Sequence, residues 1–219
     1  MFELYNKLEI KKQYFNNSTI YIIDNFYKYP EKILSFINSN PAFQHKIQDK
    51  KTFNMKHFQD LRHSYYFDDM QKVNIFLQKI INQKVKYKEY NFLTNVTKFI
   101  DRDFNDYKNN YWYPHKDFGY TALIYFDKEN INGTNLYEDI SNDFDRLKKV
   151  SEHIEPWRPK DRWKLIYTIK SKFNRCVIFN GKFYHGMAID NDIFFNKYRI
   201  NQVVFFEDIW YRQLKTYLL

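Results

Sequence analysis

Residues 199–206 have the sequence RINQVVFF, which is rich in β-branched and aromatic side chains. Such a run is typical of a strand, and residues two apart in a strand point to the same side. Arg199 and Asn201 therefore share a face with Val203 and Phe205. An arginine on the inner face of an apolar barrel needs a partner, because an unpaired buried cation is costly. No acidic residue of the chain is an obvious partner, and a bound organic acid would serve.

Upstream of this strand, hydrophobicity has a period of two from about residue 90. Several short strands separated by turns predict a sandwich or barrel. The other β-rich runs cover residues 92–100, 120–126, 134–137, 163–170 and 175–180.

The first 90 residues have a different pattern. Residues 19–27 are β-branched and aromatic and predict a strand. Two segments with apolar side chains at helical spacing follow, one starting at Pro30 and one at 69–83. We expect both helices to support a sheet.

These patterns predict one domain over 1–219. Its N-terminal strand and support helices would occupy 1–90, its β core 91–207 and a C-terminal tail 208–219. At roughly 100–200 residues per domain, a single domain is the default for this length.

One insertion interrupts the β core at 138–162. Mostly apolar side chains recur at helical spacing from Ser141 to about Ile154. Two prolines and several basic side chains around Trp157 follow. Such a loop is a common place for a substrate lid, with Trp157 and Arg158 at its tip. A surface insertion without a role explains the pattern equally well.

The composition is that of a globular protein, with 44% hydrophobic and 28% charged residues. The single cysteine, Cys176, excludes both an intramolecular disulfide and a thiolate zinc cluster, and we interpret it as a small hydrophobic residue. Neither a signal-peptide core nor a membrane-spanning apolar run occurs. We therefore expect a cytoplasmic protein without a membrane partner.

The net charge of +9 makes an anionic partner such as nucleic acid worth considering. However, no three basic residues are consecutive, and basic and acidic residues alternate, as in Asp101-Arg102-Asp103. This distribution favours a solvated basic surface, with nucleic acid as the alternative.

Two of the six histidines have a distinctive context. His115 and Asp117 lie two residues apart in an extended segment, so both side chains can face one point. His185 follows the strand-like run 176–179 and brings a third ligand from a neighbouring strand. Two histidines and one carboxylate suit a single metal ion. The remaining histidines are interpreted as surface or structural residues, namely His45, His57, His63 and His153.

Residues 90–207 resemble the Fe(II)/2-oxoglutarate-dependent dioxygenases, particularly the prolyl-4-hydroxylase-like branch. The resemblance rests on the order of the motifs: His-x-Asp at His115, a tyrosine-bearing strand, Gly133-Thr134, the distal His185, and Arg199 followed by a polar residue. It implies a mainly β fold, a double-stranded β-helix or cupin-like jelly roll with flanking helices.

The resemblance also implies roles for individual residues. The iron ligands would be His115, Asp117 and His185. The distal carboxylate of the cosubstrate 2-oxoglutarate would pair with Arg199 and meet the hydroxyl of Tyr125. Asn201 stands where many members have Ser or Thr. The cofactors would be Fe(II), 2-oxoglutarate and O2.

The activity implied is hydroxylation of an amino-acid, peptide or protein side chain, coupled to decarboxylation of 2-oxoglutarate. Tyr113, Trp157 and Arg158 are the candidates for substrate contact. Two alternatives stay open: oxidation of a nucleic-acid base by the same chemistry, and a non-enzymatic cupin-like protein that anchors a small acid at Arg199.

Overall fold

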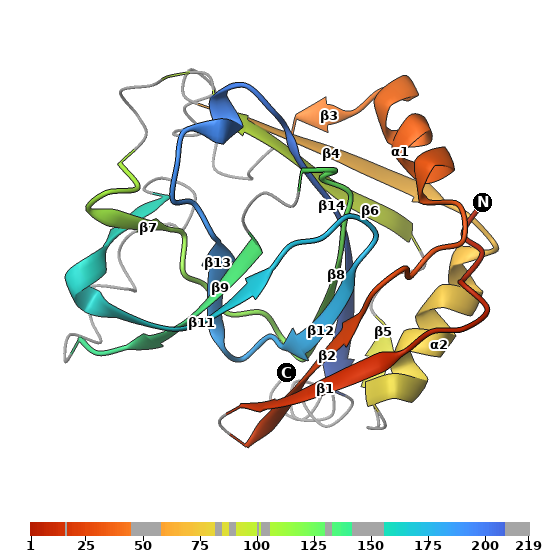
Figure 1. Cartoon of the computed structure of the whole chain (residues 1–219), viewed down its shortest axis with the longest axis horizontal. Coiled ribbons are helices and arrows are strands. Elements are labelled where there is room, and N and C mark those ends of the chain that lie inside the picture. The colour runs from red at the N-terminus through yellow and green to blue at the C-terminus, as the bar shows by residue number, and fades with distance from the viewer. Residues whose placement is uncertain are drawn as a thin grey trace, which may run out of the picture.

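A computed structural model describes residues 1–15, 17–44, 58–81, 85–87, 91–99, 101, 106–129, 133–141 and 156–208 of the chain. The main structural element of the fold is one large antiparallel sheet (Figure 1). The strands of this sheet, in spatial order, are β1 (Ile10–Phe15), β2 (Ser18–Ile23), β12 (Cys176–Asn180), β8 (Tyr120–Tyr125), β14 (Arg199–Asp208), β6 (Asn91–Phe99), β4 (Phe58–Tyr66) and β3 (Phe43–Gln44). A short strand, β5 (Val85–Tyr87), also pairs with β14.

A second layer lies beside this sheet (Figure 1). It contains β11 (Trp163–Lys170), β9 (Gly133–Asp139) and β13 (Tyr184–Met187), and next to them the pair β7 (Asn110–Trp112) and β10 (Trp157–Pro159). From β6 to β14 the chain passes back and forth between the layers. The mainly β jelly-roll fold expected from the sequence is therefore confirmed.

Two helices cover the outer face of the large sheet (Figure 1). They are α1 (Pro30–Ser39) and α2 (Met70–Ile81). Two 3-10 turns, η2 (Lys160–Arg162) and η3 (Ile193–Phe195), lie later in the chain. Ile33 of α1 and Leu77 of α2 are fully buried, in one cluster with Ile124 and Val204 of the sheet. Burial of these apolar faces, rather than helix propensity, holds short helices in place.

Alternation along β8 separates the two sides of the sheet. Ala122 and Ile124 face the helices, whereas Leu123 and Tyr125 belong to a second apolar cluster between the layers. The inner face therefore forms the wall of the jelly roll, and polar residues on that face point into its interior.

Several elements differ from the expectations. The strand expected over 19–27 ends at Ile23, because the chain bends at Asp24 and Asn25, where Asn25 has φ of 53°. The strand β4 was not predicted. Within the insertion 138–162, the helix expected over 141–154 lies outside the described residues, apart from Ser141.

The expectation that Trp157 lies at the tip of a loop is wrong, because Trp157 belongs to the strand β10. Trp157 pairs in β10 with Trp112 of β7, and its ring packs against Trp112 and Phe99. Apolar contact with two buried or half-buried rings explains why this segment joins the sheet.

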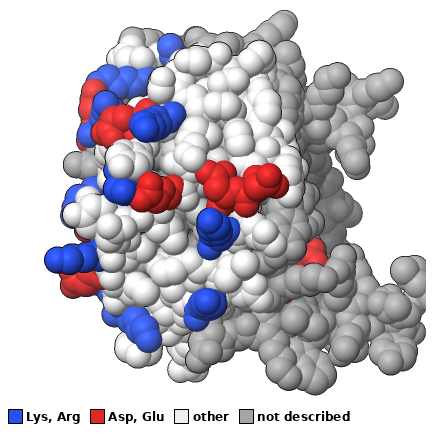
Figure 2. Space-filling model, turned by 90° about the vertical axis from the view of Figure 1, so that its right-hand side faces the viewer, with Lys and Arg blue, Asp and Glu red and all other residues white. Residues whose placement is uncertain are grey.

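On the face shown in Figure 2, basic and acidic side chains lie interspersed. This face therefore has no continuous basic patch among the residues that the structure describes. Neither helix in the described part of the chain has the length and apolarity needed to cross a bilayer. Cys176 is fully buried, and burial raises the pKa of its thiol, as expected for a structural cysteine.

Candidate metal centre

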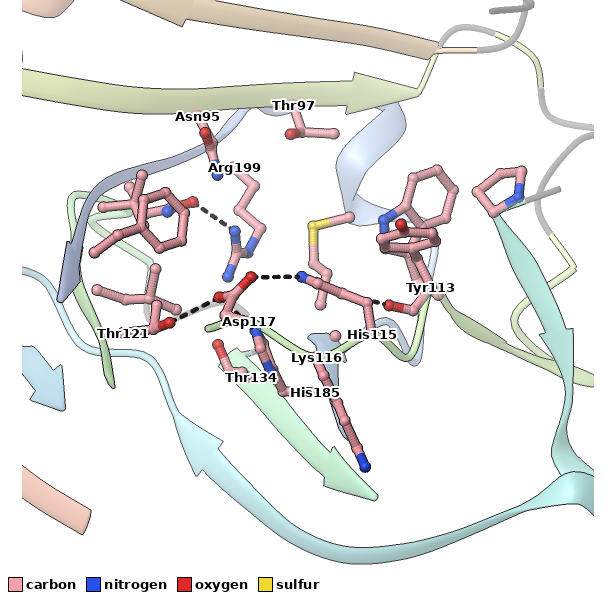
Figure 3. A pocket seen from close by; sticks show the side chains of 18 of the residues that line it. Asn95, Thr97, Tyr113, His115, Lys116, Asp117, Thr121, Thr134, His185 and Arg199 are labelled. Carbon is pink, nitrogen blue, oxygen red and sulfur yellow. Dashed lines mark hydrogen bonds and ion pairs between the residues drawn. The ribbon is translucent and has the colours of Figure 1, made fainter. Parts of the chain in front are cut away.

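The side chains of the three expected ligands converge on one point (Figure 3). The Nε2 atom of His185 lies 3.2 Å from Oδ2 of Asp117, and Nε2 of His115 lies 3.9 Å from Oδ1 of the same carboxylate. One donor atom from each side chain can be chosen so that all lie within 4.8 Å of one another. His185 is buried at 4% exposure, whereas the His115 and Asp117 side chains are partly exposed.

Both histidine rings are held in the orientation that a metal requires. Nδ1 of His115 lies 2.9 Å from the carbonyl oxygen of Tyr113, and Nδ1 of His185 lies 2.9 Å from that of Phe183. A carbonyl only accepts, so Nδ1 carries the proton and donates, which leaves the lone pair of Nε2 directed toward Asp117.

Tyr113 has an unusual backbone conformation, with φ of 43°. This left-handed region is strained for a bulky residue. It lets the Tyr113 carbonyl meet the His115 ring while the Tyr113 N–H donates to the carbonyl of Pro156 at 2.6 Å. The strained backbone of Tyr113 thus lies two residues before the candidate metal ligand His115.

The Asp117 carboxylate is held in its ionised form. Burial alone would raise its pKa, but the hydrogen bond and charge of His185 and the charge of His115, each in its doubly protonated form, and the hydrogen bond from Thr121 lower it to about 2. The Thr121 hydroxyl donates to Oδ2 at 2.7 Å. An ionised carboxylate is the form that ligates a metal.

Two glycines allow the ligand segments to approach. A Cβ at Gly181 would lie 2.7 Å from Cβ of Asp117, whose N–H donates to the Gly181 carbonyl at 2.8 Å. A Cβ at Gly186 would lie 2.2 Å from the carbonyl oxygen of Trp112. Only glycine fits at such close backbone contacts.

Arg199 lies on the inner face of β14, as alternation predicted, and is 6% exposed. Its guanidinium donates to Oδ1 of Asn201 at 2.5 Å and makes a longer contact of 3.4 Å with the Gly133 carbonyl. The guanidinium also lies 5.8 Å from the ring centroid of Tyr125. Among the described residues, no carboxylate forms an ion pair with it.

Asn201 is 1% exposed, and its Nδ2 donor has no hydrogen-bond partner in the described structure. A buried donor left unsatisfied costs about 1–3 kcal/mol. Asn201 lines the cavity beside Arg199, so a bound anion would satisfy both groups. The hydroxyl of Tyr125 instead lies 2.8 Å from that of Thr134, which lines the cavity.

Asp127 lies behind Arg199 and is 5% exposed. Its Oδ1 accepts the Ile200 N–H at 2.8 Å, whereas Oδ2 has no described partner. Burial raises its pKa to about 6, against the opposing effects of the Arg199 charge and the Ile200 hydrogen bond.

The ligands and Arg199 line one cavity with a volume of about 360 Å³. Tyr113 lines it, whereas Trp157 and Arg158 are not among its described lining residues. Sequence reasoning missed Arg62, Asn95, Thr97 and Thr121. Asn95 and Thr97 were detectable, because polar residues at alternate positions of the predicted strand 92–100 mark a polar inner face (Figure 3).

His63 is not among the described residues that line this cavity. His63 is buried, with Nδ1 2.8 Å from the Thr94 hydroxyl and Nε2 3.1 Å from the Asn40 carbonyl, and is structural as expected. His45, His57 and His153 lie outside the described residues.

Comparison with known proteins places the chain in a family. The family model described as "Family of unknown function (DUF6445)" matches residues 6–198. The chain belongs to the DUF6445 family. No curated protein matches the sequence of this DUF6445 member.

A solved structure similar to this DUF6445 member is described as the crystal structure of an oxidoreductase, 2OG-Fe(II) oxygenase family, from Burkholderia pseudomallei. The match has 7% sequence identity and a TM-score of 0.49, and covers 86% of this chain and 84% of that one.

Proposed function

We propose that the chain is an Fe(II)/2-oxoglutarate-dependent hydroxylase of an amino-acid, peptide or protein side chain. One observation carries the proposal: the donor atoms of His115, Asp117 and His185 converge in a cavity that also holds the buried Arg199. The sequence resemblance assigns the same residues to these roles.

The donor set fits Fe(II). Two neutral imidazoles and one carboxylate are the ligands of non-haem Fe(II) oxygenases, and they leave coordination positions open. When bound, Fe(II) would supply the chemistry by which 2-oxoglutarate and O2 react. The chain's own contribution is to hold the two Nε2 lone pairs and the ionised carboxylate of Asp117 on one point.

The other end of the cosubstrate would be held by Arg199. Its guanidinium and the Nδ2 donor of Asn201 lie side by side in a buried part of the wall. Charge-assisted hydrogen bonds to a carboxylate would satisfy both. Tyr125 supports this arrangement, because its ring lies beside the guanidinium and its hydroxyl bonds to Thr134.

The overall reaction consumes the substrate C–H bond, 2-oxoglutarate and O2, and gives the alcohol, succinate and CO2. The protein residues position the C–H bond and exclude water, while the oxidation belongs to the metal and cosubstrate.

The test is succinate formation by the purified protein supplied with Fe(II), O2 and 2-oxoglutarate. We expect succinate and CO2 in equal amounts, dependent on Fe(II). Replacement Arg199→Gln should weaken the apparent affinity for 2-oxoglutarate by about ten- to a hundredfold. The control Arg162→Gln, which removes an arginine paired with Asp139 outside the cavity, should leave it unchanged.

Two results would separate the alternatives. Carboxylate binding without any succinate formation would favour the cupin-like binding protein. Salt-dependent affinity for DNA or RNA, together with an oxidised base as product, would favour the nucleic-acid enzyme.

A further inference from the structure

A groove with a volume of about 760 Å³ lies on the outer face of the small sheet formed by β11, β9 and β13 (Figure 1). Side chains alternate along β9: Thr134 and Leu136 face the interior of the jelly roll, whereas Asn135 lines the groove. Thr168 of β11, opposite Asn135 in the register, also lines it. The groove and the candidate metal centre therefore lie on opposite faces of this sheet.

Basic side chains line both ends of the groove. Lys160 precedes β11, and its ammonium donates to the Lys108 carbonyl at 2.9 Å, so these two lysines share one end. The other end is lined by Lys170, the last residue of β11, and by Lys172 and Arg175 after it. The two basic groups are thus separated by the length of one strand.

Acidic side chains balance only part of this charge. Asp190 is the acidic residue among the described lining residues. Asp24, which is not among them, pairs with both cations that follow β11, at 3.1 and 2.6 Å. In the part of the chain that the structure describes, no carboxylate forms an ion pair with Lys108, Lys160 or Lys170. Three ammonium groups at the two ends therefore remain for an anionic ligand.

The groove is neutral between its ends and is long. The hydroxyl of Thr168 donates to Oδ1 of Asn135 at 2.7 Å, and Leu165 beside them is 41% exposed. Leu165 and Lys170 both line the groove, and a strand rises about 3.3 Å per residue, so its length is at least roughly 15 Å. A single small anion would reach one end only, whereas about five residues of an extended peptide would reach both.

We infer that this groove binds an extended acidic peptide segment of a partner protein, with carboxylates at its two ends and neutral side chains between them. The net charge of +9 favours approach of such an anionic partner. The inference does not depend on the proposed function.

The aromatic lining favours a peptide over a single-stranded nucleic acid. Bases bind by stacking on open aromatic faces. The ring centroid of Tyr111 in the groove lies 4.7 Å from that of Tyr137 and 5.2 Å from the Lys160 ammonium. This ring is therefore already packed against groups of the protein itself.

The experiment is fluorescence anisotropy of short, capped, labelled peptides titrated with the full chain at low salt. The acidic probe is Asp-Glu-Ala-Ala-Glu-Asp, and the matched probes are Asn-Gln-Ala-Ala-Gln-Asn and Lys-Lys-Ala-Ala-Lys-Lys. A short oligothymidylate tests for nucleic acid.

The variants change one lysine at each end of the groove. They are Lys160→Gln with Lys170→Gln, and the charge-inverted pair Lys160→Glu with Lys170→Glu. The matched control, Lys72→Gln with Lys79→Gln, removes the same charge from α2, which covers the large sheet.

We expect native protein to bind the acidic peptide, more weakly as salt is raised, and not the neutral one. The glutamine pair should weaken binding by about five- to thirtyfold, and the α2 control should stay within about twofold of native. The glutamate pair should lose the acidic peptide and bind the lysine peptide instead, a reversal that misfolding would not produce. Saturating 2-oxoglutarate should leave peptide binding unchanged, because the candidate metal centre lies on the other face of the sheet.

Four results would overturn the inference and leave the proposed function standing. Native protein could fail to distinguish the acidic peptide from the neutral one, or the glutamine pair could bind the acidic peptide as native does. Displacement of the peptide by 2-oxoglutarate would place it in the cavity of Arg199 instead. Tighter binding of oligothymidylate, weakened by the same two substitutions, would make the groove a nucleic-acid site.

Discussion

His115 and His185, 70 residues apart in the sequence, form an antiparallel bridge in which each backbone N–H donates to the carbonyl of the other. The two hydrogen bonds are 2.9 and 2.8 Å long. The bridge brings the imidazole rings to a centroid separation of 4.3 Å. Backbone pairing between β13 and the segment after β7 therefore sets the spacing of the two candidate metal ligands.

This bridge depends on Gly186. Gly186→Ala should push β13 away from the Trp112 carbonyl, because the new Cβ would lie 2.2 Å from that oxygen. We expect a loss of about 1–3 kcal/mol of unfolding free energy and roughly ten- to a hundredfold weaker Fe(II) binding. Denaturant unfolding and anaerobic equilibrium dialysis measure the two effects. Native iron affinity in this variant would show that the close approach is not needed.

Asn201→Asp places a carboxylate beside Arg199 with almost no change of shape. In the native protein, the Arg199 guanidinium donates to the Asn201 amide oxygen. The new carboxylate should form an ion pair with that guanidinium and so compete with the carboxylate of the cosubstrate. We expect affinity for 2-oxoglutarate to fall by at least about a hundredfold, with Fe(II) binding retained. Unchanged 2-oxoglutarate affinity, measured by calorimetry, would place the distal carboxylate elsewhere.

Asp127 should make the stability of the protein depend on pH. Its pKa is raised from 3.8 to about 6 in the folded protein, so folding favours the protonated form. The resulting stabilisation is fully present below about pH 4 and is lost as the pH rises through about 6. At pH 7.5, Asp127→Asn should therefore be more stable than native protein by up to about 3 kcal/mol.

The matching measurement is urea unfolding of native protein and Asp127→Asn at about pH 4 and 7.5. Asparagine keeps an oxygen that can accept the Ile200 N–H, so the difference should shrink at the lower pH. A difference that does not change with pH would mean that the Asp127 carboxyl does not titrate as described.

Local sequence pattern was sufficient for most of the fold and for predicting that the candidate ligand side chains lie together. Strand alternation placed Arg199 and Asn201 on one face, and the His-x-Asp spacing placed His115 and Asp117 together, because both rules depend only on the period of a strand. Pairing between strands depends on contacts distant in the sequence. This is why β4 was missed, and with it Arg62, which enters the cavity only because β4 pairs with β6.

The interpretation of Trp157 failed for a related reason. Prolines and basic residues around it indicated a loop, but its ring packs on Trp112 and Phe99, which lie far away in the sequence. A short three-residue strand such as β10 has no periodicity of its own, so only its tertiary contacts define it.

The most direct test of the central claim is the amount of Fe(II) bound per chain under anaerobic conditions. It should be measured on native protein, His115→Ala, His185→Ala and the control His63→Gln, which changes a buried histidine outside the cavity. We predict one Fe(II) per chain for native protein and His63→Gln, and loss of most iron affinity in the two ligand variants. Full iron binding by both His115→Ala and His185→Ala would contradict the assignment of this metal centre.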